Sequence, residues 1–174
     1  MSMEVPFRAL PASFQIAGAS AASLLGILLA SKPTGSSFRV LVDRIYNRST
    51  LIAAGTGVGI EIAVRRLTAL TGGTTGSVVL LDPSPPPDMP PITSLITCVT
   101  LGTATAGDVL DYIVQNNDEV PTTGRIDGDR PIFETPRGGS PIVVYPGKGL
   151  DVEHITNSTV GRFCPIIEGR LVWG

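Results

Sequence analysis

The residue types that carry most enzyme chemistry are scarce in this chain of 174 residues. His154 is the only histidine, so a metal site built on two histidines is impossible. Its spacing from Leu150 and Val152 places it on their face of a strand, which favours a histidine at the edge of the core. A Ser-His-Asp triad stays open, because its members meet only in space, but the chain has no Gly-x-Ser-x-Gly elbow. We therefore predict no catalytic residues.

A glycine-rich segment at residues 55–59, Gly-Thr-Gly-Val-Gly, is the closest approach to a phosphate-binding loop. Such a loop needs a helix N-terminus after it, so that backbone N–H groups meet the phosphates. Residues 59–67 alternate as a β-strand instead, the third glycine comes one position early, and no P-loop lysine is present. The segment predicts a hairpin turn, and we expect no cofactor.

Acidic residues gather in the second half of the chain, where residues 88–174 carry eleven acidic and six basic side chains. Asp108 and Asp111 could pair as an acid and a base, but nothing distinguishes them from solvated turn residues. Asp127-Gly128-Asp129 departs from the calcium-loop pattern, which needs a third ligand and a later glutamate. The pattern favours a solvated loop region, with a weak cation site or a contact with a basic partner as the alternative. The acidic residues concerned are Asp108, Asp111, Asp118, Glu119, Asp127 and Asp129.

Two cysteines, Cys98 and Cys164, are too few for a disulfide framework and lack the spacing of metal ligands. We expect two buried thiols in a protein made in the cytosol, with a single disulfide as the alternative. No metal site is predicted.

The charge of the chain limits its partners. The formal net charge is −2 and the pI about 5.3, and the basic residues do not cluster beyond Arg65-Arg66, so direct nucleic-acid binding is not expected. Charged residues make up only 16%, against about 25% in typical domains. This deficit predicts that partner subunits cover part of the surface.

Nearly every apolar run has the length of a strand, and Gly, Pro, Ser or Thr closes it. With 20 Gly and 15 Pro the chain is rich in turn residues. The pattern predicts an all-β protein, an antiparallel β-sandwich or jelly roll of eight or nine strands. The expected strands are residues 22–30, 38–46, 59–67, 77–81, 93–101, 109–115, 142–145, 150–156 and 160–173.

Four segments carry further expectations. Residues 77–81 form an apolar run after Ser77, which predicts a strand buried on both faces. Six prolines in residues 82–91 predict a stiff connector that crosses from one sheet to the other, with a ligand for a proline-binding domain as the alternative. Residues 116–141 are expected to form a long polar loop. Pro165 predicts an edge position or a bulge in the last strand.

The N-terminal segment is predicted to be an extended arm, residues 1–20, attached to a single β-sandwich domain, residues 21–174. Residues 16–30 are apolar but too short to span a membrane, and no basic region of a signal peptide precedes them. Burying two large apolar side chains of the arm against a partner would contribute roughly 3–6 kcal/mol. The partner-binding residues expected in the arm are Val5, Phe7, Leu10 and Phe14.

Three segments together resemble a known family. They are the small-residue run at residues 17–22 before Leu24-Leu25, the strand at residues 38–45, and the threonine-rich hairpin at residues 67–74. Over residues 15–115 the residue composition and pattern are similar to those of small jelly-roll virion proteins of tailed bacteriophages, of the capsid cement or decoration kind. The resemblance implies a protein without enzymatic activity that clamps capsid subunits as a homo-oligomer, and it transfers no site residues.

The sequence therefore predicts a viral structural protein, made in the host cytoplasm, that binds the major capsid protein and stabilises the outside of the virion as a dimer or trimer. It predicts no enzyme, no direct nucleic-acid contact and no membrane contact. The alternative is a receptor- or glycan-binding β-sandwich module of a fibre or tail. Scattered aromatic residues weigh against a glycan reader; they are Trp173, Tyr46, Tyr112 and Tyr145.

Overall fold

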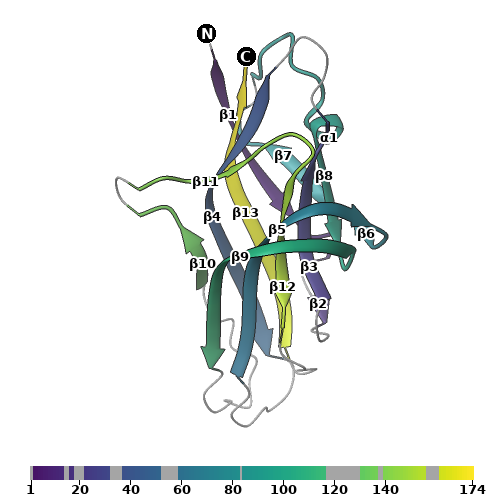
Figure 1. Cartoon of the computed structure of the whole chain (residues 1–174), viewed down its shortest axis with the longest axis vertical. Coiled ribbons are helices and arrows are strands. Elements are labelled where there is room, and N and C mark those ends of the chain that lie inside the picture. The colour runs from purple at the N-terminus through teal and green to yellow at the C-terminus, as the bar shows by residue number, and fades with distance from the viewer. Residues whose placement is uncertain are drawn as a thin grey trace.

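The chain folds into two antiparallel β-sheets that pack face to face as a β-sandwich, as the sequence predicted (Figure 1). The computed structural model describes residues 2–13, 16–17, 22–31, 37–51, 59–82, 84–116, 130–136, 139–155 and 161–174. Among these residues the one helix is the single turn α1 (Ile92–Leu95). Polar and apolar residues alternate along some strands, such as residues 3–10 and 150–154, which turn one face to the core.

Sheet A contains the first and the last strands of the chain side by side. Its order from edge to edge is β10 (Arg130–Glu134), β4 (Phe38–Leu51), β13 (Gly161–Trp173), β1 (Met3–Leu10) and β7 (Ser77–Leu80). Two further short strands join it: β11 (Ile142–Val144) pairs with β4, and β2 (Ile16–Ala17) pairs with β13. Figure 1 shows β1 beside β13, with both ends of the chain at one end of the sandwich.

Sheet B is built from the middle of the chain. Its order is β6 (Thr74–Thr75), β8 (Ile96–Thr100), β3 (Ala22–Leu29), β12 (Gly149–His154), β5 (Gly59–Thr71) and β9 (Thr103–Asn116). The tight turn from β5 to β6 uses Gly72 and Gly73, whose φ angles of 65° and 73° are costly for other residues. The predicted turn is confirmed, but it is not a hairpin, because β6 pairs with β8 whereas β5 pairs with β12 and β9.

The core lies between the two sheets and is mostly aliphatic, as the small share of aromatic residues requires. Val42 and Leu171 of sheet A and Leu25 and Val64 of sheet B are all fully buried members of one cluster. The proline-rich connector joins β7 of sheet A to α1 and β8 of sheet B, so its predicted crossing between sheets is confirmed. Such a crossing lets two strands close in sequence line opposite sides of this core.

The predicted N-terminal arm is wrong for residues 3–10, because they form β1 inside sheet A. This strand pairs with β13 from Met3 opposite Trp173 to Ala9 opposite Ile167, and with β7 on its other side. Val5 and Phe7 are buried in the core. The apolar character that suggested a partner is satisfied within the chain itself, since both sides of the strand find hydrogen-bonding neighbours.

Two other strand predictions need correction. The strand at residues 77–81 is not buried on both faces: β7 ends sheet A and alternates between exposed and half-buried residues, with Val79 exposed. The long loop predicted at residues 116–141 contains a strand, because residues 130–134 form β10 against β4. In both cases neighbouring strands, rather than local composition, decide the outcome.

Pro165 lies in a central strand rather than at an edge, and the nearest bulge falls between Glu168 and Gly169. Its neighbour Cys164 donates its N–H to Oδ1 of Asn47 on β4. Successive N–H groups of a strand point to opposite sides, so the ring nitrogen of Pro165 faces away from β4. On that side the partner changes from β2, at Phe163, to β1, at Ile167. The proline therefore occupies the break between two partner strands, where it removes no hydrogen bond of the ladder.

We expect Phe7→Ala to lower the free energy of unfolding by about 3–5 kcal/mol, because it leaves a cavity in the core. Met3→Ala on the same strand is the control; Met3 is 51% exposed, and its loss should cost less than about 0.5 kcal/mol. Denaturant unfolding followed by Trp173 fluorescence measures both. Similar small effects from both substitutions would contradict the placement of β1 in the core.

Candidate functional site

The residues predicted to bind a partner are dispersed. Val5 and Phe7 belong to the core, whereas Leu10 is half-buried on the outer face of sheet A against Tyr46 and Cys164. Phe14 lies outside the described residues. The structure thus does not bring Val5, Phe7 and Leu10 together into a docking surface.

His154 lies in the core, as its parity predicted. The side chain is fully buried between the sheets, and its ring centroid is 4.9 Å from that of Phe163. Packing against the opposite sheet accounts for its position.

The two cysteines are buried and form no disulfide, as predicted. Cys98 lies on β8 of sheet B and Cys164 on β13 of sheet A. Burial raises the pKa of the Cys98 thiol to about 12, with its Sγ 3.6 Å from the carbonyl oxygen of Leu10. A thiol with so high a pKa is a poor nucleophile at neutral pH.

The predicted acidic candidates do not assemble into a site. Asp108 is exposed on β9, and Oδ1 of Asp111 accepts a hydrogen bond from the N–H of Tyr112. Within the described ranges, no group of three or more His, Cys, Asp or Glu side chains is arranged to hold a metal ion. Other candidates lie outside the described residues; they are residues 55–58, Asp118, Glu119, Asp127 and Asp129.

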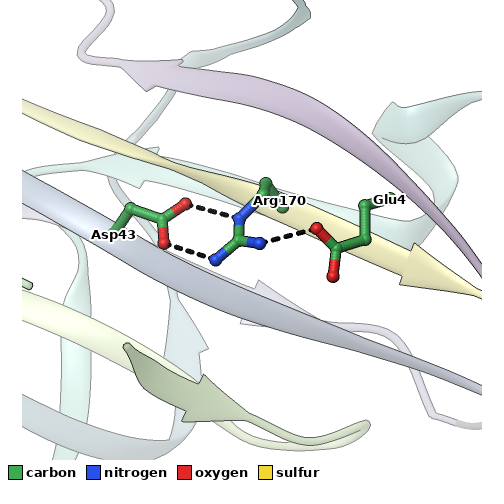
Figure 2. A network of polar contacts seen from close by, with 3 residues as sticks. All are labelled: Glu4, Asp43 and Arg170. Carbon is green, nitrogen blue, oxygen red and sulfur yellow. Dashed lines mark hydrogen bonds and ion pairs between the residues drawn. The ribbon is translucent and has the colours of Figure 1, made fainter. Parts of the chain in front are cut away.

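The most ordered polar arrangement lies on the outer face of sheet A and joins three strands (Figure 2). Nε and Nη2 of Arg170 on β13 donate to the two carboxylate oxygens of Asp43 on β4, at 2.9 and 2.8 Å. Nη1 donates to Oε2 of Glu4 on β1, at 2.6 Å. We call these three residues the arginine clamp. Hydrogen bonds to Asp43, and then to Glu4, raise the pKa of Arg170, which keeps it charged.

A bulge in β4 makes the arginine clamp possible. Val42 pairs with Gly169 and Arg44 with Glu168, which leaves Asp43 as the extra residue. Asp43 and Arg44 therefore both face outward, between the buried Val42 and Ile45. A Cβ on Gly169 would lie 2.3 Å from the carbonyl oxygen of Leu41, so the close approach of the strands at the bulge requires glycine.

Further ion pairs flank the arginine clamp. Arg8 of β1 binds Glu168 of β13, with Nη2 to Oε1 at 2.5 Å, and Tyr46 donates to the same oxygen at 3.2 Å. The guanidinium of Arg44 stacks 4.6 Å from the centroid of the Tyr46 ring. These contacts surround a shallow hollow of about 560 Å³. Since arginines lie against its carboxylates, the arrangement serves to fix strands in register rather than to transfer protons.

A buried carboxylate lies on the outer face of sheet B. Asp151 of β12 is only 1% exposed, and its Oδ1 accepts a hydrogen bond of 2.5 Å from the hydroxyl of Ser23. The Arg65–Glu153 ion pair, at 2.6 Å, is beside it. Burial raises the pKa of Asp151 to about 6, since desolvation disfavours the charged form.

Exposed apolar side chains lie on the edge strands. Val109 and Tyr112 are about half exposed on β9, which ends sheet B, and Val79 is similarly exposed on β7, which ends sheet A. A long edge strand with apolar side chains is a place where another chain can pair.

A second hollow, of about 390 Å³, lies at the end of the sandwich where Ser2 and Gly174 meet. Its wall includes the exposed ring of Tyr145, the exposed Arg39, and the buried side chains of Phe38 and Val172. We call this the terminal hollow. It combines an apolar lining with one cationic group, which is the composition of many small-molecule sites.

No protein-family model, curated protein or solved structure matches this chain. In the part of the chain that the structure describes, no helix has the length and apolar character of a membrane span.

Sequence reasoning missed three of these features. The arginine clamp joins residues far apart in the chain, and only the fold brings them together. Asp151 alternates with apolar residues along its strand, a pattern typical of a solvent-facing side chain, but it is buried. Tyr145 had one available signal, an aromatic residue directly before the Pro146-Gly147 turn.

We expect Arg170→Gln to lower the free energy of unfolding by about 1 kcal/mol, because the arginine clamp is partly exposed. The loss should shrink at high salt, which screens exposed charges. Denaturant melts at low and high ionic strength measure it. An effect independent of salt would argue that Arg170 acts through packing.

We expect the folding stability of Asp151→Asn, relative to that of the unmodified protein, to increase as pH rises. The folded pKa of about 6 lies above the unfolded value near 3.8, so the folded protein loses stability as pH rises through this window. Between pH 5 and pH 8 the stability difference should shift towards the variant by about 1–2 kcal/mol. Asp108→Asn, at an exposed aspartate, is the control and should show no such shift. Parallel pH series for the two variants would contradict the burial of a charged Asp151.

Proposed function

We propose that this protein is a structural component of a virion that attaches as a homo-oligomer to the outside of a capsid and stabilises it. The proposal rests on the edge strands. They offer apolar side chains, and among the described residues no further strand pairs with their outer sides, on a chain with few charges. The expected partner is the major capsid protein, and the texture shared with capsid cement proteins supports the same role.

The observation that carries the proposal is the exposed edge of β9. This strand runs for 14 residues, Thr103–Asn116, and ends sheet B with Val109 51% and Tyr112 46% exposed. Monomeric proteins usually protect such an edge with charges, prolines or covering loops. A second copy that adds its own β9 would satisfy the edge by antiparallel pairing and would cover both side chains.

The polar network of sheet A suits a protein that must resist mechanical stress. The arginine clamp and the Arg8–Glu168 pair tie β1, β4 and β13 together across the outer face. These contacts resist sliding of the first and last strands. A protein that stabilises a shell under internal pressure needs strands that do not separate. The N-terminal segment contributes here as part of the sheet, not as a free arm.

The test compares Val109→Lys with Val79→Lys, which changes a similarly exposed valine on the other sheet edge. Analytical ultracentrifugation should show an oligomer for the unmodified protein and for Val79→Lys, and a monomer for Val109→Lys. Co-sedimentation with shells of the major capsid protein from the same virus should fall at least about tenfold for Val109→Lys, since a buried lysine at the interface costs more than 1.4 kcal/mol.

Two results would overturn the proposal. One is an unmodified protein that stays monomeric and does not sediment with the shells. The other is full oligomerisation and shell binding by Val109→Lys, which would remove β9 from the interface.

A further inference from the structure

The terminal hollow is separate from the edge strands that carry the proposed function. Its volume of about 390 Å³ falls in the usual range for small-molecule sites, about 300–1,000 Å³. It lies at the end of sheet A, where β4, β11 and β13 come together. A ligand here would leave the β9 edge open for a second copy.

The apolar part of the terminal hollow suits a ligand with a ring better than an extended, flexible ligand. Tyr145 is the most exposed large apolar side chain described, at 59%, and Pro146 lines the hollow beside it. Val172 and Phe38 contribute apolar surface that is almost buried. An exposed aromatic ring next to an apolar wall stacks well against the C–H face of a pyranose, while the phenol hydroxyl stays available for hydrogen bonds.

Arg39 supplies the charge. It lies opposite Val172 on β13, and the register of β11 with β4, with Val144 opposite Val40, brings Tyr145 next to it. Among the described residues no carboxylate pairs with Arg39, whereas Arg8, Arg44 and Arg170 all face one. Glu4, one strand away across Val172, is already held by Arg170.

The polar rim offers further partners. The hydroxyl of Ser37 donates to the carbonyl oxygen of Gly174, which leaves its own oxygen able to accept a hydrogen bond from a ligand hydroxyl. The guanidinium of Arg39 is a planar donor whose geometry matches a carboxylate with two parallel hydrogen bonds.

We propose that the terminal hollow binds an acidic sugar, with the pyranose ring on Tyr145 and the carboxylate on Arg39. This would give the chain a capacity to bind acidic surface glycans, in addition to its role on a shell. The charge complementarity at Arg39 selects an acidic over a neutral sugar, and the exposed ring of Tyr145 selects a sugar over a simple carboxylate.

The experiment titrates the whole protein with sodium glucuronate, glucose and sodium acetate. Trp173 is the only tryptophan, and its ring centroid lies 6.2 Å from that of Phe38 in the wall, so its fluorescence reports occupancy. We expect saturable millimolar binding of glucuronate, and binding of glucose and acetate weaker by at least about tenfold.

Arg39→Gln and Tyr145→Ala should each weaken glucuronate binding by about tenfold or more. The controls are Arg48→Gln, at an exposed arginine of β4, and Tyr112→Ala, at an exposed tyrosine of β9; neither lines the terminal hollow, and both should bind like the unmodified protein. The circular dichroism spectrum of every variant should match that of the unmodified protein, so that weaker binding cannot be attributed to unfolding.

Three outcomes would overturn the proposal. They are an absence of saturable glucuronate binding, equal binding of glucose or acetate, and glucuronate binding that survives both Arg39→Gln and Tyr145→Ala. Chemical-shift changes of backbone amides around residues 37–39 and 145–146 provide an independent reading of where glucuronate binds.

Discussion

The pairing of the first strand with the last is the contact on which the rest of this structure depends. β13 lies between β4 and β1, so it holds the two halves of sheet A together. Without β1, one side of β13 and the inner side of β7 would lose their hydrogen-bonding partners, and the core would open along Phe7 and Ala9. On its other side β13 pairs with β4, where it forms the bulge at Asp43 and one wall of the terminal hollow.

Burial and charge have different roles in sheet A. A large side chain such as Phe7 contributes several kcal/mol through packing. The partly exposed ion pairs around Arg170 contribute about 1 kcal/mol each at most. The core therefore supplies the stability, and the arginine clamp fixes the register. A slip of one residue would turn the apolar face of β1 outward and would also break the contact of Glu4 with Arg170.

Much of the fold was predictable because strand periodicity and turn residues are local signals. The two sheets, the crossing by the proline-rich connector and the burial of His154 all follow from spacing. The failures share one cause, since pairing partners are not local. Val5 and Phe7 look the same in sequence whether they face a partner protein or the protein's own core, and Pro165 looks like an edge marker unless the break between β1 and β2 is known. Among the sites, only the terminal hollow had a signal in the sequence, which was the aromatic residue Tyr145 directly before the Pro146-Gly147 turn.

The central place of β13 also decides when the protein can fold. β13 follows every other described strand in the chain, and β1 precedes them all. All strands of sheet B leave the ribosome before β13, although its central strand β12 ends at His154, shortly before β13 begins at Gly161. Sheet A cannot close until β13 emerges, so the apolar face of β1 waits unpaired through most of translation. Contacts so distant in sequence form slowly. Sheet A thus closes late relative to the synthesis of these residues, and the nascent chain is most exposed to aggregation and to chaperones just before β13 appears.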